Sequence, residues 1–304
     1  MINNNKYSKL VFGALFISFF FFIFSSFSFH INTIPDEIRR YVNAYPGIVN
    51  VVCYDQEKND WLLNINGVPL FWAGSRFLPE KELDNSSSWR PHLDYTYSDT
   101  IPNPNDKTVF SDELVSRLKS EDFYKARKLQ NPYYTGFYNA LYDCASRTAL
   151  EKHIVNIKFL GHYLNIHEKL VSKLFQVEKQ IYALRDKEIK HGIKPEYGTV
   201  QFFLDQLLDI QGYSWREVSD TSNPSQHSRG IALDILPKGW KTKNMYWRWR
   251  ADWDSNWMLL PLENRWMPAP DVIKAFENEG FIWGGKWILW DNMHFEYRPE
   301  LCRN

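Results

Sequence analysis

The sequence predicts an α+β fold, on the evidence of three patterns. From Ile231 to Ile235 large apolar residues alternate with smaller or polar ones, the two-residue period of a strand that buries one face. Two aromatic-rich runs, 287–290 and 293–297, flank the turn-prone pair Asp291-Asn292 and predict a hairpin. Between residues 111 and 190 apolar positions recur at spacings of three and four, which predicts helices, with Ser111 as an N-terminal cap.

The two predicted strand regions place titratable side chains on polar faces. Asp234 shares a face with the small residue Ala232, which leaves room beside it, while the opposite face is apolar. In the second region His294 and Glu296 point one way and the intervening residues the other. His227 lies seven residues before Asp234.

These residue types predict a metal-dependent hydrolase. Two neutral imidazoles and one carboxylate form a three-ligand catalytic zinc site, whose open position takes a water with a lowered pKa. His227, Asp234 and His294 supply that set. Asp291, three residues before His294, is placed by the turn to take the proton of that water. A single histidine on an apolar strand is more often a core residue, so the prediction depends on both segments occurring together.

The same segments resemble a known family, the zinc D-alanyl-D-alanine carboxypeptidases and dipeptidases of bacterial cell walls, with the related phage endolysins that cut L-alanyl-D-glutamate bonds. The family pattern is Ser-x-His-x6-Asp, followed much later by an acidic residue, two spacers and His. This chain matches it at the five positions Ser225, His227, Asp234, Asp291 and His294. The run 280–287 and the tail 296–300 are similar to a carboxypeptidase subgroup.

The resemblance implies a fold and a set of roles. The fold is the small antiparallel sheet with helices found in DD-peptidase and hedgehog-like domains. His227, Asp234 and His294 would hold Zn²⁺, Asp291 would be the general base, and Ser225 would help to bind substrate. Glu296 is interpreted as a partner that orients an imidazole, with a surface salt bridge as the alternative.

One position departs from the family pattern. An arginine that stabilises the oxyanion usually follows a Gly-Tyr pair, but here Gly212-Tyr213 is followed by Ser-Trp and the nearest arginine is Arg216. Arg229 lies closer in sequence to His227 and is the alternative, as a substrate-binding or oxyanion-stabilising group. Either guanidinium provides a fixed positive charge where negative charge develops.

The chain divides into three predicted regions: 1–29, a signal peptide or membrane anchor; 30–193, a mixed strand and loop region followed by a helical one; and 194–304, the catalytic domain with a helix at 200–208. His162 and His167 fall within the helical pattern and are expected to be solvated helix residues. Four tryptophans, at 247, 249, 253 and 257, are interpreted either as a substrate platform or as buried apolar area.

Composition and the N-terminus indicate an exported protein. Lys+Arg and Asp+Glu both number 36, so no basic excess points to a nucleic-acid partner. Lys6 and Lys9 precede an apolar run to about Phe24, followed by small residues, in the order of a secretory signal. The length of that run also allows an uncleaved tether to the inner membrane. We expect a periplasmic or cell-envelope location, where peptidoglycan lies.

The sequence therefore predicts a zinc D-alanyl-D-alanine carboxypeptidase that hydrolyses peptidoglycan stem peptides. An L-alanyl-D-glutamate endopeptidase with the same metal chemistry is the nearest alternative. A non-catalytic wall-binding module on the same fold is a third, against which the retained base and ligands argue.

Overall fold

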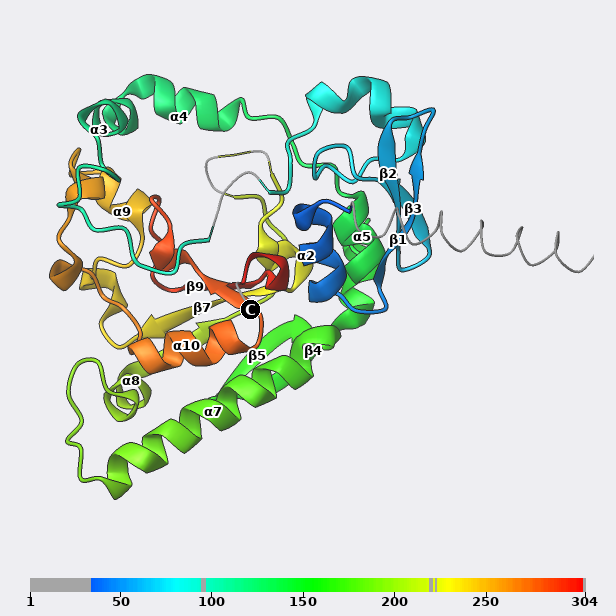
Figure 1. Cartoon of the computed structure of the whole chain (residues 1–304). Coiled ribbons are helices and arrows are strands. Elements are labelled where there is room, and N and C mark those ends of the chain that lie inside the picture. Colours follow the sequence, from blue (N-terminus) through cyan, green and yellow to red (C-terminus); the bar gives the residue numbers. More distant parts are fainter. Residues whose placement is uncertain (1–33, 94–96, 219–220, 222, 303–304) are drawn as a thin grey trace, which may run out of the picture.

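The computed structural model describes residues 34–93, 97–218, 221 and 223–302, and it has the α+β fold that the sequence predicts (Figure 1). The first half contains α2 (Asp36–Ala44), β1 (Val49–Asp55), β2 (Asp60–Ile65), β3 (Val68–Phe71), α3 (Asp112–Lys119), α4 (Glu121–Lys128), α5 (Gly136–Tyr142) and α6 (Arg147–Leu150). The second contains β4 (Ile154–Phe159), β5 (His162–His167), α7 (Val171–Lys190), α8 (Val200–Gln206), β6 (Leu207–Gln211), β7 (Ala232–Pro237), α9 (Trp247–Ala251), α10 (Pro270–Asn278), β8 (Phe281–Trp283) and β9 (His294–Tyr297).

An antiparallel sheet with strand order β6-β7-β9-β8 carries the residues that matter most for function. Its strand β7 confirms the strand predicted from the alternation between Ile231 and Ile235. Every residue of β7 is buried, because the strand lies between β6 and β9. On one face of the sheet α10 packs through Phe276, whose ring stacks 4.1 Å from that of Phe295.

The predicted hairpin over 287–297 is wrong in its first strand. Strand β9 pairs with β8, which ends at Trp283, and the chain then makes a 3-10 turn over Gly284–Lys286. A side chain at Gly285 would overlap the indole of Trp283 at 2.2 Å, so the turn closes directly over that ring. Of the following aromatic run, Trp290 is fully buried in a separate apolar cluster, and this burial explains its character without a strand.

The helical prediction for 111–190 is confirmed at both ends and wrong in the middle. Ser111 caps α3 by accepting a hydrogen bond from the Leu114 amide, and α7 forms the last twenty residues. Residues 154–167 instead form the hairpin β4–β5, whose turn at Leu160-Gly161 has positive φ at both residues, as a type I′ hairpin turn requires. Consequently His162 and His167 lie on a strand, and His167 is buried.

The β4–β5 hairpin supports the loop that carries His227. The amide of His167 donates to the carbonyl of Gly230, and the amide of Tyr213 donates to the carbonyl of Asn165. Gly230 has a φ of +66°, and an added Cβ would lie 2.5 Å from the side chain of Ile154. Only glycine satisfies both the backbone conformation and the close contact at this position.

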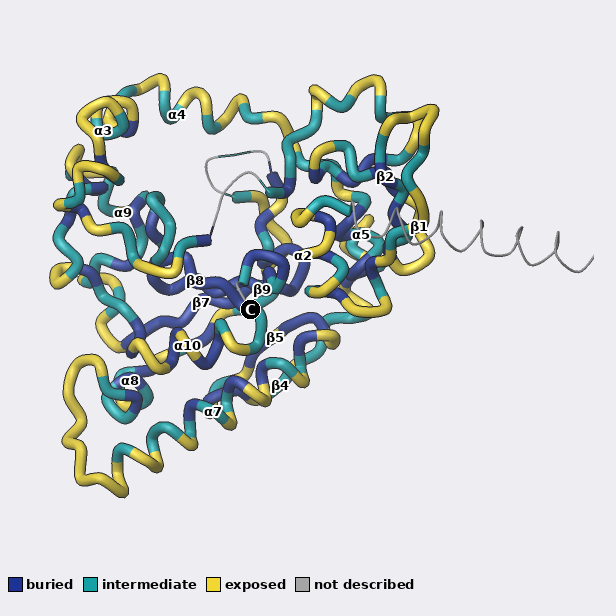
Figure 2. The backbone as a smooth tube through the Cα atoms, in the orientation of Figure 1, coloured by how far each residue is buried: buried dark blue, intermediate teal, exposed yellow. Residues whose placement is uncertain are grey.

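One apolar cluster extends across both halves of the chain, from Ile38 on α2 to Phe295 on β9. Figure 2 shows the strands β7 and β9 buried, while the outer side of α7 and much of α3 and α4 are exposed. The domain boundary at residue 194 stays a prediction, and the packing across it is continuous.

The predicted export segment, 1–29, lies outside the described residues. In the part of the chain that the structure describes, no helix combines the length and apolar character needed to cross a bilayer.

Candidate metal centre

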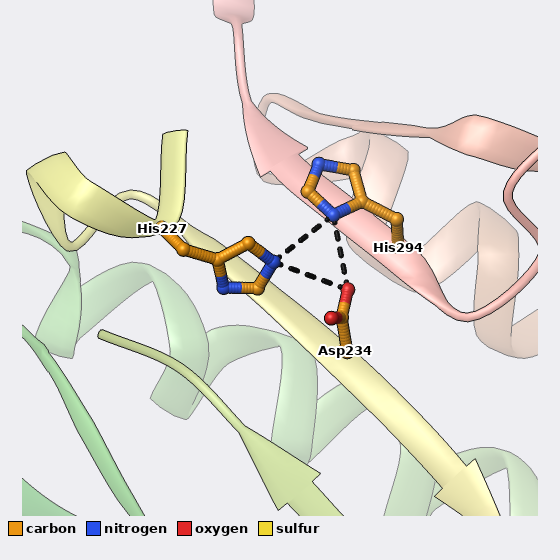
Figure 3. Close-up of side chains that lie close together, drawn as sticks. All are labelled: His227, Asp234 and His294. Carbon is orange, nitrogen blue, oxygen red and sulfur yellow. Dashed lines mark hydrogen bonds and ion pairs between the residues drawn. The ribbon is translucent and has the colours of Figure 1, made fainter. Parts of the chain in front are cut away.

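Three elements bring the predicted metal ligands together (Figure 3). His227 lies on a short 3-10 helix, Gln226–Arg229, which Ser225 caps by accepting a hydrogen bond from the His227 amide. Asp234 lies on β7 and His294 on β9, and the antiparallel register sets these two residues directly opposite each other. Cross-strand partners of this kind share one face of a sheet, so the pairing itself directs both side chains to the same point.

The three ligand atoms form a small triangle. Nε2 of His227 lies 3.2 Å from Nδ1 of His294 and 3.2 Å from Oδ1 of Asp234, and Nδ1 of His294 lies 3.0 Å from the same oxygen. Ligands about 2.0 Å from a tetrahedral zinc ion are separated by about 3.3 Å. The observed spacing is therefore close to what a zinc ion needs, although slightly tighter.

Hydrogen bonds on the far side of each imidazole fix which nitrogen faces the centre. Nδ1 of His227 lies 2.7 Å from the carbonyl oxygen of Gly212 and therefore carries the proton. Nε2 of His294 lies 3.1 Å from Oε2 of Glu296 and donates to it in the same way. When both rings are neutral, the remaining ring nitrogens, 3.2 Å apart, each present a lone pair toward the centre, where a cation can bind. The residues present thus fit a metal ion.

The charges around the triangle lead to the same conclusion. Burial disfavours the charged form of Asp234, but His227 and His294 outweigh it and hold the pKa of this carboxyl well below its ordinary value. Burial lowers the pKa of His294, yet the hydrogen bonds to Asp234 and Glu296 outweigh burial and raise it to about 10. The buried carboxylates therefore favour positive charge at this point, which either a protonated His294 ring or, with that proton displaced, a divalent cation provides.

Asp291 lies beside this centre and lines the same cavity as the three ligands. Burial raises its pKa to about 8, and the negative charge of Asp234 adds to the shift. Its Oδ1 atom is buried and has no hydrogen-bond partner among the described residues. The backbone fixes its place, because the Asp291 amide donates to the carbonyl of Gly284, where an added Cβ would come within 2.5 Å of the Asp291 carbonyl oxygen.

The two candidate arginines occupy different environments. Arg229 is buried, its guanidinium lies 4.2 Å from the ring centroid of Tyr138, and it donates to the carbonyl of Pro224 and to Gln226. Arg216 is exposed and lines the cavity. Its backbone is held by its carbonyl oxygen, which accepts a hydrogen bond from the amide of Ser225. Arg216 thus retains more freedom to face a bound substrate, and Arg229 is mainly engaged in packing.

The ligands open into a cavity of about 1110 Å³ that both halves of the chain line. The first half contributes residues that sequence reasoning missed, notably Arg90, Arg127 and Tyr133. They lie in loops and on α4, without a periodic or motif signal that would have identified them. Of the four tryptophans considered, Trp257 is buried and Trp253 is exposed, whereas the buried Trp247 and the 41% exposed Trp249 both line the cavity.

Comparison with known proteins supports a peptidase. Residues 219–297 match the family described as D-alanyl-D-alanine carboxypeptidase. The matched region contains the three ligand positions and Asp291, and it supports a metallopeptidase of the zinc type in this part of the chain. Residues 37–94 match a domain of unknown function, DUF8518. Neither the curated proteins nor the solved structures contain a match to this chain.

Removing one imidazole tests the ligand set. We expect His227→Ala to abolish zinc retention, because one histidine and one carboxylate leave an incomplete site. The control is His162→Ala on β5, outside the cluster, which should keep one zinc per chain. Elemental analysis after dialysis measures both, and full zinc occupancy in His227→Ala would exclude that histidine as a ligand.

Proposed function

We propose that this protein is a zinc-dependent D-alanyl-D-alanine carboxypeptidase that hydrolyses the stem peptides of peptidoglycan. The observation that carries the proposal is the cluster of His227, Asp234 and His294 in one cavity with the partnerless carboxylate oxygen of Asp291. The family match over residues 219–297 supports the same activity.

His227, Asp234 and His294 would hold the zinc ion, and Glu296 would orient the His294 ring. When bound, zinc would supply the two effects that it provides in hydrolases, a lowered pKa for water and polarisation of a carbonyl group. The chain positions all three ligands through the sheet and its capped loop, so that binding requires little rearrangement.

Asp291 would act as the general base and then as the general acid. Its Oδ1 atom accepts the proton of the attacking water and delivers it to the nitrogen of the departing D-alanine. A buried carboxylate oxygen that accepts no hydrogen bond from the residues described is suited to this task, since none of them competes for it. The hydrogen bond from its amide to the carbonyl of Gly284 holds the backbone of Asp291 in place.

Arg216 would stabilise the negative charge that develops on the carbonyl oxygen of the scissile bond. Its exposure within the cavity supports this assignment over Arg229, whose guanidinium is packed against Tyr138. Arg229 and Ser225 would instead shape the substrate-binding floor below the loop of His227.

An L-alanyl-D-glutamate endopeptidase is the second candidate, and the size of the cavity favours it. A volume of about 1110 Å³ exceeds that of most small-ligand pockets and has room for peptide on both sides of a scissile bond. A wall-binding module without catalysis is the third candidate, but it gives no reason for a buried Asp291 oxygen that lacks a partner among the described residues.

For any of the three candidate functions, we propose export by segment 1–29 to the cell envelope.

Digestion of purified muropeptides tests the activity. The zinc-loaded protein should remove one terminal alanine from pentapeptide stems, and mass spectrometry would detect the shortened product. Release of a peptide cut after the first residue would instead identify the endopeptidase. Unchanged muropeptides at saturating zinc would contradict both the carboxypeptidase and the endopeptidase hypotheses.

Substitution of the two carboxylates that flank His294 separates their roles. Asp291→Asn should retain zinc and fold but lower turnover by about two to four orders of magnitude, because proton transfer is lost. Glu296→Gln should weaken zinc affinity about 10–100-fold and leave the zinc-saturated enzyme largely active. Turnover at saturating zinc measures the difference, and the reverse pattern would move the base to Glu296.

A further inference from the structure

The region that matches only a domain of unknown function, residues 37–94, reaches the metal centre through a buried polar chain. We propose that this region serves as a support for the metal site, and that it acts through Tyr45, Glu300, Arg298 and Glu296 to hold the His294 ring in its ligand orientation. The inference rests on the metal centre proposed above. The four residues from Tyr45 to Glu296 are positioning residues, since of the residues in this contact series only His294 would touch the ion.

The first link lies on β9 and the residues that follow it. Glu296 accepts from Nε2 of His294 through Oε2, and its other oxygen, Oε1, lies 3.5 Å from Nη1 of Arg298. The two carboxylate oxygens of Glu296 are thereby engaged on opposite sides. Rotation of this carboxylate away from the imidazole would break its contact with the guanidinium.

The second link connects Arg298 to the first half of the chain. Nε of Arg298 donates to Oε1 of Glu300, and Nη2 donates to the carbonyl oxygen of His92, 3.3 Å away. The His92 amide in turn donates to the carbonyl of Ser75. The planar guanidinium therefore contacts two carboxylates and one backbone carbonyl at once, which fixes its orientation.

The last link comes from the end of α2. The hydroxyl of Tyr45 donates to Oε2 of Glu300 at 2.8 Å, although the two residues are 255 positions apart. The carboxylates of Glu296 and Glu300 share the guanidinium of Arg298. Glu300 therefore needs a further hydrogen-bond donor, and the hydroxyl of Tyr45 supplies it. The exposed fraction is 5% for Tyr45, 2% for Glu300, 5% for Arg298 and 6% for Glu296.

Burial makes each link sensitive to the next. Water cannot readily replace a lost hydrogen-bond partner at these buried positions. Loss of one donor therefore leaves a carboxylate charge unsatisfied, and the neighbouring side chains must move to contact it. The nearest adjustments available are shifts of Arg298 and then of Glu296, which reduce the hold on Nε2 of His294. The predicted consequence is weaker metal binding, not merely lower stability.

Tyr45→Phe in the full chain is the test, because it removes one hydroxyl and leaves the ring in the core. Tyr54→Phe is the matched control, since its hydroxyl bonds to Asn59 at 2.6 Å on the surface of the same region. We expect Tyr45→Phe to raise the zinc dissociation constant about threefold to tenfold, below the roughly 10–100-fold effect of a group bonded directly to a ligand. Tyr54→Phe should leave it unchanged.

Two further measurements separate positioning from general stability. The absorption bands of the Co²⁺-substituted protein report ligand geometry and should shift in Tyr45→Phe and in Arg298→Lys, which keeps the charge but loses the planar fork. Unchanged zinc affinity and Co²⁺ spectra in both variants, with only a lower melting temperature of the metal-free protein, would overturn the support role. Failure of the unsubstituted protein to bind zinc would instead overturn the metal centre itself. The zinc content of the unsubstituted protein shows this outcome without any variant.

Discussion

The antiparallel register of β7 and β9 is the constraint on which the site depends, because it sets Asp234 opposite His294. A shift of one strand by one residue would turn its ligand, Asp234 or His294, to the opposite face, which is packed with apolar residues. The third ligand, His227, reaches the same point from a loop held by Gly230 and by the β4–β5 hairpin. The metal centre therefore forms where a sheet register and a supported loop coincide.

The first half of the chain contributes to this centre in two ways. Residues from its loops and from α4 line the cavity into which the ligands open, so that the cavity belongs to both halves. The polar contacts from Tyr45 to Glu296 connect the two halves, and Tyr45 itself belongs to the apolar cluster that joins them. The three candidate ligands and the residues that reach them through these polar contacts thus lie on segments far apart in sequence.

The sequence was informative where a local pattern decides the structure. The alternation through Ile231–Ile235 predicts β7, and the ligand spacing identified the three residues that the structure brings together. Local patterns misled where burial has another cause: Trp290 fills a separate apolar cluster, and residues 154–167 satisfy a helical spacing although Leu160-Gly161 turns them into a hairpin. The contact between Tyr45 and Glu300 leaves no local signal, because only tertiary packing brings the two together.

The central claim, that His227, Asp234 and His294 hold a zinc ion, is tested most directly by anomalous diffraction from crystals of the zinc-loaded protein. Data collected on both sides of the zinc absorption edge should give one anomalous peak at the centre of the three ligand atoms, about 2.0–2.2 Å from each. A peak located elsewhere, or none at this position in crystals that contain zinc, would contradict the account.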